Sequence, residues 1–154
     1  MAERLSRELI REAPLLRAEQ GVRSAMTALL DSSLPALPVV DEKGRLCGIF
    51  GEREFFGALF PGYLKTLSGA GFVRKPVDDH IEKRAECAME PIAEHMNRER
   101  VEAEAPPSDV QLAETFLHHE VLIVPVTEDG RVTGVVTRGD FFRALAERFG
   151  DLTG

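Results

Sequence analysis

"PVTEDGRVTGVVTRGDFFRAL", residues 125–145, decides the fold because the chain contains the same pattern twice. The earlier copy, "PVVDEKGRLCGIFGEREFFGAL", occupies residues 38–59 and matches the later one with one residue of slippage. From the glycines onward the shared residues lie at one constant offset, since Gly44 falls on Gly130 (130 − 44 = 86). Self-similarity at a fixed distance is typical of repeated structural units. The sequence therefore predicts two halves built on one plan.

The plan of each half follows from the residues around these copies. A segment with Val, Ala and Leu on one face precedes each copy, "VRSAMTALL" from Val22 and "VQLAETFL" from Val110, and its spacing predicts a helix. A short apolar strand then ends in Pro-Val, and "DEKGR" or "EDGR" indicates a hairpin turn because Asp and Gly tolerate positive φ. A second strand and an amphipathic closing helix follow. We expect an α/β (α+β) fold of two β-α-β-β-α units, whose sheets pack against each other because one unit alone leaves its sheet exposed.

A connector separates the two halves. Pro61-Gly62 ends the first closing helix. From about residue 77 to 96, Glu, Arg and Ala recur with helical periodicity, which predicts a structured helical connector. The chain is therefore expected to divide into a first repeat with an N-terminal helix at residues 1–62, the connector at 63–92, and a second repeat at 93–154.

Composition excludes several classes of protein. The 154 residues include 19 Lys plus Arg against 26 Asp plus Glu, and the net charge of −7 repels nucleic-acid backbones, so no nucleic-acid partner is expected. No apolar run approaches the roughly 20 residues that a membrane span needs, and the N-terminus lacks the uninterrupted apolar stretch of a signal peptide. We expect a cytoplasmic protein that does not enter a membrane.

Residues typical of metal binding and catalysis form no recognisable pattern. Cys47 and Cys87 lie outside any CxxC motif, and the adjacent His118 and His119 point to different faces of regular structure, so no metal site is expected. GxSxG, Walker, Rossmann-glycine and HExxH motifs are missing from the sequence. The polar residues of the connector form no catalytic constellation either. We expect a protein that is not an enzyme.

The repeated Pro-Val, acidic turn, Gly-Arg and following Gly resemble the CBS domain, a module named after cystathionine β-synthase that occurs as tandem pairs called Bateman modules. The resemblance covers about residues 14–60 and 93–148. It implies pseudo-twofold pairing of the halves through their sheets and two clefts that commonly hold adenosine-containing ligands. It also implies a flat homodimer through the helices, with the paired phenylalanines of both closing helices in or beside a core or interface.

The start of the second closing helix is the candidate site. Thr137 followed by Asp140 fits a capping box, in which the hydroxyl and the carboxylate bond the free amides of the first turn. A helix N-terminus also attracts phosphate, and there Thr137 adds a hydroxyl donor and Arg138 a counter-charge. The spacing alone leaves both interpretations open. The CBS resemblance favours the second, because it implies that Thr137 and Asp140 are the phosphate and ribose contacts of a nucleotide.

The resemblance further implies an apolar wall for the base. Ile123 and Pro125, on the strand that leads into the hairpin, and Val101, near the start of the second repeat, are the candidates. The first repeat departs from the pattern, since Gly51 replaces the hydroxyl residue and Glu54 is one methylene longer than aspartate. The resemblance therefore supports a ligand in the second cleft, and the departures at Gly51 and Glu54 leave open whether the first cleft is occupied.

Two hypotheses of function follow. The first is a regulatory module that binds AMP, ADP, ATP, S-adenosylmethionine or another adenosyl compound and signals to an unidentified regulated protein. The second is a dimerising structural or interaction module whose clefts bind no ligand. Stabilisation of the fold by a panel of nucleotides distinguishes the two, because only a ligand that binds the native state raises its stability.

Overall fold

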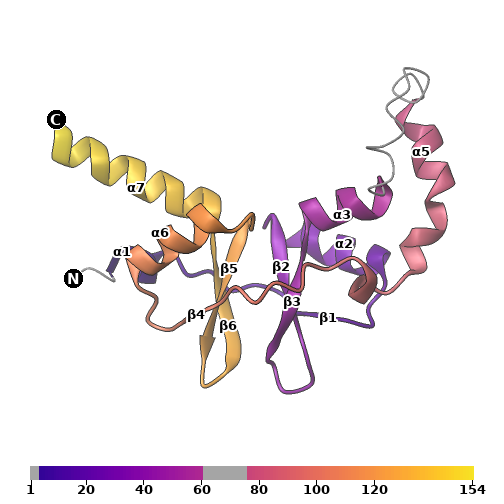
Figure 1. Ribbon diagram of the computed structural model, residues 1–154, viewed down its shortest axis with the longest axis horizontal. Helices are drawn as coiled ribbons and strands as arrows, with labels where there is room; N and C mark the ends of the chain where they lie inside the picture. The colour runs from indigo at the N-terminus through magenta and orange to yellow at the C-terminus, as the bar shows by residue number, and fades with distance from the viewer. Residues whose placement is uncertain (1–3, 61–75) are drawn as a thin grey trace.

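The computed structural model describes residues 4–60 and 76–154 and contains two units with the same β-α-β-β-α order of elements (Figure 1). The elements of the first repeat are β1 (Leu16–Arg17), α2 (Val22–Ser32), β2 (Ala36–Val40), β3 (Leu46–Gly51) and α3 (Glu52–Leu59). Those of the second are β4 (Ala103–Glu104), α6 (Asp109–His118), β5 (Ile123–Glu128), β6 (Arg131–Thr137) and α7 (Arg138–Thr153). Helix α1 (Arg4–Glu8) precedes the first repeat. The expected fold class is confirmed.

Each repeat forms a three-stranded sheet with the same topology. The strand orders are β1-β2-β3 and β4-β5-β6, with the first pair parallel and the second pair antiparallel in both sheets. Both antiparallel pairs shift register at a matching place, after Val39 in one and after Val126 in the other. The internal repeat of the sequence is thus an internal repeat of the structure, down to its irregularity.

The two hairpin turns form where the acidic Gly motifs predicted them. Asp41 closes the first turn because its Oδ1 accepts the backbone N–H of Lys43 at 2.8 Å and of Arg45 at 3.0 Å. The hydrogen bond from Arg45 is the main reason that the pKa of the Asp41 carboxyl lies below its ordinary value. Gly44 and Gly130 both have a φ of 80°, a conformation that residues with a side chain rarely adopt.

The repeats exchange their leading segments across a pseudo-twofold axis. The backbone of Arg11 pairs with Val135 on β6, with N–H to O distances of 2.8 and 2.9 Å. The backbone of Asn97 pairs in the same way with Ile49 on β3, at 2.9 and 2.8 Å. The two pairs occupy matching positions of the repeats, because Asn97 matches Arg11 (97 − 11 = 86) and Val135 matches Ile49 (135 − 49 = 86). Each sheet therefore receives an edge segment that precedes the other repeat in sequence.

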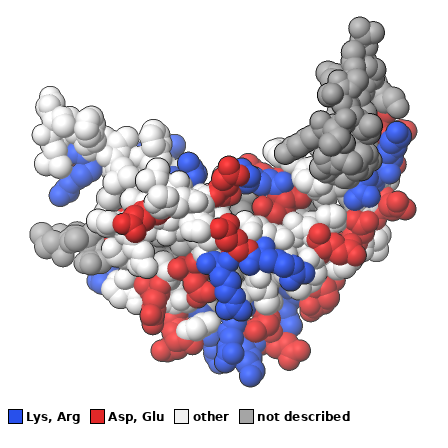
Figure 2. All heavy atoms as spheres, viewed as in Figure 1, with Lys and Arg blue, Asp and Glu red and all other residues white. Residues whose placement is uncertain are grey.

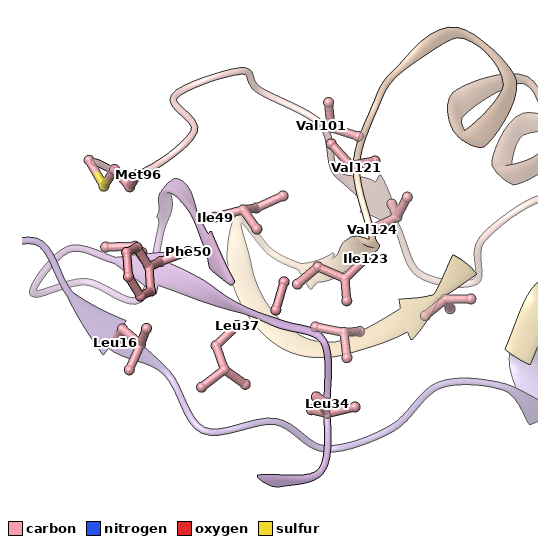
Figure 3. Close-up of a cluster of buried hydrophobic side chains, with 14 of the residues drawn as sticks. Leu16, Leu34, Leu37, Ile49, Phe50, Met96, Val101, Val121, Ile123 and Val124 are labelled. Atoms are coloured by element: carbon pink, nitrogen blue, oxygen red, sulfur yellow. The ribbon is translucent and has the colours of Figure 1, made fainter. Parts of the chain in front are cut away.

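One hydrophobic core serves both repeats. The buried cluster includes Leu37, Ile49 and Phe50 from the first sheet together with Ile123 and Val124 from the second (Figure 3). These five side chains are at most 2% exposed. Burial of apolar surface stabilises by about 25 cal/mol per Å², so this shared core makes each repeat depend on the other.

The connector is helical only in part. Helix α5 (Val77–Lys83) is followed by two short 3₁₀ turns, η2 (Ala85–Met89) and η3 (Ile92–Glu94). The described part of the connector is thus a series of short helical segments, and Pro91, which has no N–H to donate, lies between η2 and η3. The predicted helix stop at Pro61-Gly62 and the boundary between residues 62 and 63 lie outside the described residues. The division into 1–62, 63–92 and 93–154 stays a prediction.

Candidate functional site

Helix α7 begins at the candidate site, and Thr137 is its N-cap. The Thr137 Oγ1 accepts the backbone N–H of Asp140 at 3.0 Å, and the Thr137 residue is only 5% exposed. This is the hydroxyl half of the predicted capping box. The carboxylate half is not formed, because the Asp140 side chain turns to another partner. The cap and the carboxylate are therefore separate features of this helix start.

Arg11 is the partner of Asp140. Its Nε donates to Asp140 Oδ2 at 2.7 Å and its Nη2 donates to Asp140 Oδ1 at 2.8 Å, so the guanidinium holds both carboxylate oxygens. The Arg11 side chain is 47% exposed and that of Asp140 17%. Sequence reasoning missed Arg11. The sequence offered one signal: at the repeat offset of 86, Arg11 holds the position before the first repeat that Asn97 holds before the strands of the second.

The predicted base wall lies in the core beside this helix start. Ile123 is the strand partner of Thr137, and Pro125 is the partner of Val135. Ile123 and Val101 belong to the buried cluster and are 0% and 4% exposed (Figure 3). Pro125 is buried as well. The structure thus brings Thr137 and Ile123 directly together. In this state the buried residues present almost no surface to a ligand.

Arg138 points away from the Asp140 carboxylate. Its Nη1 donates to the carbonyl of Phe116 near the end of α6 at 3.0 Å, and its backbone N–H donates to the carbonyl of Leu122 at 2.9 Å. The guanidinium thus stabilises the C-terminal end of α6, where carbonyl groups lack helical partners. Its role as a phosphate contact stays a prediction.

The first repeat has the other half of the capping box. Here the backbone N–H of Gly51 donates to Glu54 Oε1 at 2.8 Å, while Gly51 has no side chain to cap the helix in return. Glu54 is half-buried, and burial raises the pKa of its carboxyl above the ordinary value despite the opposing hydrogen bond from Gly51. The Glu54 carboxylate is therefore used within its own helix start.

Gly51 is also a steric requirement. A Cβ built on Gly51 would lie 2.4 Å from the carbonyl oxygen of Pro35 and 2.5 Å from Cα of Ala36. Both neighbours are backbone atoms that cannot rotate away, so a side chain at position 51 requires the backbone of Pro35 and Ala36 to shift. The first repeat cannot be converted to the second by replacing one side chain.

A third group of polar residues lies at the end of the connector and just after it. Oxygen and nitrogen atoms of Glu90, Glu94 and His95 lie within 4.8 Å of one another, a spacing compatible with a metal ion. Glu90 Oε1 already bonds His95 Nε2 at 2.8 Å and lies 3.4 Å from Arg84 Nη2. The Arg84 guanidinium therefore already places a positive charge beside the Glu90 carboxylate, as a metal ion would. These contacts describe an ion-pair cluster.

Comparison with known proteins links the geometry to one family. A sequence profile of the CBS domain matches residues 7–61 and 108–147, and no curated protein sequence matches the chain. Among solved structures, the CBS-pair protein CBSX2 from Arabidopsis thaliana has 15% identity and a TM-score of 0.70, with 94% of this chain and 95% of that chain covered. The structure of CBSX2 in complex with AMP has 16% identity and a TM-score of 0.64, with 92% of this chain and 96% of that chain covered. The CBS domain of a CBS-domain-containing membrane protein from Sphaerobacter thermophilus has 23% identity and a TM-score of 0.67, with 93% of this chain and 86% of that chain covered. At these identities the likeness concerns the fold.

Proposed function

The chain belongs to the CBS-domain family, and on that premise we propose that it is a regulatory module that binds an adenine nucleotide or another adenosyl compound at the start of α7. Occupancy of this site is then signalled to a partner protein. The proposal includes a cytoplasmic location and a role that is regulatory and not catalytic. In the described residues, 4–60 and 76–154, no helix has the length and hydropathy of a membrane span.

One observation carries the proposal. The Asp140 carboxylate is not consumed by the cap of its own helix, because Thr137 alone caps α7. A short, charged double acceptor next to a helix N-terminus has the chemistry to receive two ribose hydroxyls, while the positive end of the helix dipole favours a phosphate. Hydrogen bonds to charged groups contribute roughly 1.5–3 kcal/mol each, enough to orient a nucleoside.

The ligand class rests on the adenosine moiety. AMP, ADP, ATP and S-adenosylmethionine share the ribose and the adenine, so each can place its two ribose hydroxyls on the Asp140 carboxylate. One solved structure of similar fold contains CBSX2 in complex with AMP, which makes AMP the first compound to test. We propose Ile123, Pro125 and Val101 as the wall for the base, which requires the cleft to open when the ligand enters.

Signalling follows from the shared core. A ligand shifts a conformational equilibrium only by its difference in affinity between two states. Because each sheet receives a segment that precedes the other repeat, a change at the α7 start affects the packing of both repeats. We propose that the relative arrangement of the repeats is what the regulated protein senses.

Thermal unfolding with a nucleotide panel tests the proposal. AMP, ADP, ATP, S-adenosylmethionine and adenosine are compared with GMP, which has the same phosphate and ribose but another base. A ligand at 100 times its dissociation constant adds roughly 2.7 kcal/mol of stability. The proposal predicts a rise in midpoint with at least one adenosyl compound and less with GMP. No shift with any adenosyl compound contradicts it.

The helix faces support self-association, which we propose as a homodimer. Leu30 on α2 and Leu117 on α6 are 75% and 78% exposed, and Phe56 on α3 and Phe142 on α7 are 59% and 70% exposed. Figure 2 shows charged side chains gathered at the hairpin end, whereas the surface of α6 and α7 at the upper left is largely uncharged. Burial of matching apolar faces between two copies removes this surface from water. Sedimentation at micromolar concentration should give a dimer, and a monomer alone contradicts it.

The second candidate function is a dimerising interaction module without a ligand. The closed first helix start favours it, since the space next to Gly51 is filled by Pro35 and Ala36. A dimer that no adenosyl compound stabilises supports this alternative. A dimer that is stabilised supports the sensing module, so the same protein preparation distinguishes the two.

A further inference from the structure

The Asp140 carboxylate has a partner from the opposite end of the chain. Arg11 belongs to the N-terminal arm, which we define as residues 4–13, and it lies 129 positions away in sequence. Its guanidinium fork places one N–H on each carboxylate oxygen, at 2.7 and 2.8 Å. Paired N–H donors of this kind give arginine both strength and directional preference for carboxylates.

The N-terminal arm is fixed against the second repeat at Arg11 and upstream of it. The backbone of Arg11 forms two hydrogen bonds with Val135. Upstream, Ser6 is fully buried, and both its backbone N–H and its hydroxyl donate to the carboxylate of Asp109 at the start of α6. The arm therefore presents Arg11 to Asp140 with little loss of freedom beyond that of the side chain itself.

The ion pair and a ribose compete for the same atoms. Two vicinal hydroxyls require one oxygen each of the Asp140 carboxylate, and Arg11 occupies both oxygens while the side chain of Asp140 is only 17% exposed. We propose that Arg11 is a latch on the ligand site: the Arg11–Asp140 ion pair must open before an adenosyl ligand can bind, which lowers affinity and couples ligand binding to release of the N-terminal arm. This inference rests on the proposed function, because it concerns the regulation of that site.

The first repeat has no such latch. The residue at the matching position is Asn97, and its Oδ1 accepts the backbone N–H of Glu99 at 2.9 Å. The matching carboxylate, Glu54, accepts the N–H of Gly51. The latch is thus a property of the second helix start alone, where the carboxylate is free of the cap.

The expected size of the effect follows from exposure. Arg11 is 47% exposed, so solvent screens the pair, and pairs of this kind contribute about 0.2–1 kcal/mol. Removal of the latch should therefore tighten ligand binding by about 1.4- to fivefold. A larger gain is not expected, because the backbone bonds of the arm to Val135 remain.

Titration calorimetry tests the latch with AMP and with adenosine, which lacks a phosphate. The proteins are the full chain as wild type, Arg11→Ala and Arg7→Ala. Arg7 is exposed on the same arm, so its substitution removes an equal charge without contacting Asp140. The latch predicts that Arg11→Ala binds both compounds more tightly than wild type, while Arg7→Ala binds as wild type does.

The other outcomes overturn the latch in distinguishable ways. Equal affinities of wild type and Arg11→Ala for both compounds leave the proposed function intact and remove the latch. Weaker binding of AMP by Arg11→Ala, with adenosine unchanged, identifies Arg11 as a phosphate contact and also removes the latch. Equal tightening in Arg7→Ala assigns the effect to net charge and removes it too. If no adenosyl compound binds wild type or Arg11→Ala, the proposed function fails and the latch fails with it.

Discussion

Helix α3 and helix α7 start from matching positions of the two repeats, and each has a different half of the capping box. At α3 the carboxylate of Glu54 bonds the N–H of Gly51, and there is no hydroxyl. At α7 the hydroxyl of Thr137 bonds the N–H of Asp140, and the carboxylate is turned away. Either half is sufficient to begin a helix.

The difference shows how one repeat can serve stability and the other recognition. A carboxylate that bonds its own helix start is not available to a ligand, as with Glu54. When a hydroxyl caps the helix instead, the carboxylate can bond a group from elsewhere, as Asp140 does with Arg11. The asymmetry between the repeats, and not their symmetry, therefore distinguishes the proposed site at the start of α7 from the start of α3.

The largest effect on stability is expected when Gly51 at the start of α3 is replaced by threonine, the residue at the matching position of α7. Gly51→Thr places a Cβ 2.4 Å from the carbonyl oxygen of Pro35, and this backbone cannot move aside without disturbing the β2–β3 pairing. We expect a loss of about 3 kcal/mol in the free energy of unfolding, measured by urea denaturation.

Gly57 on the same helix provides the control for this substitution. A Cβ at Gly57 meets nothing within 4 Å, so Gly57→Ala should stabilise the protein by up to about 1 kcal/mol. If Gly51→Thr unfolds with the same free energy as wild type, the two helix starts are interchangeable and the difference between them has no steric cause.

Substitution of the two carboxylates should separate the repeats by ligand affinity. Asp140→Asn replaces a charged double acceptor by a neutral group with one acceptor, so affinity for AMP should fall on the order of tenfold to several-hundredfold. Glu54→Gln should leave the affinity near that of wild type, because the Glu54 carboxylate serves its own helix start. Calorimetry on the three proteins measures both changes. Equal affinities for wild type and Asp140→Asn would leave Asp140 without a role in binding.

The cap of α7 can be tested without a ligand. Thr137→Ala removes the hydroxyl that accepts the N–H of Asp140 at 3.0 Å, and the loss should be about 1 kcal/mol of unfolding free energy. Ser108 caps α6 with a longer bond of 3.3 Å to the N–H of Gln111, so Ser108→Ala is the matched variant and should cost less. A larger loss for Ser108→Ala would show that burial of the Thr137 hydroxyl adds nothing to its cap.

The smallest effect is a dependence on pH that belongs to the first repeat. Burial raises the pKa of Glu54 in the folded protein, so the native state binds this proton more tightly than the unfolded chain. The stability from this group is complete below the unfolded pKa of about 4.3 and is lost as pH rises through the folded value. The stability of wild type minus that of Glu54→Gln should therefore decrease as pH rises through the raised pKa of Glu54. A constant difference would contradict a raised pKa.

Local signals explain why much of the fold could be predicted from the sequence. The turns at Gly44 and Gly130 and the cap at Thr137 each depend on residues within four positions of one another. Both turns form as predicted, and so does the hydroxyl half of the capping box. The Arg11–Asp140 pair spans 129 positions and depends on the exchange of leading segments between the repeats, so no local pattern indicates it. The structure adds a physical reason for Gly51 as well. The sequence shows only a missing hydroxyl there, whereas the close approach of the β2 backbone appears once the strands pair.

The central claim is that an adenosyl ligand binds at the second helix start and not at the first. A crystal structure of the protein grown with AMP tests it most directly, because it locates the nucleotide in one repeat or the other. We predict one AMP per chain, with its ribose hydroxyls on the Asp140 carboxylate, Arg11 displaced from that carboxylate, and no nucleotide beside Glu54. An AMP bound beside Glu54, or one whose ribose lies away from Asp140, would contradict it.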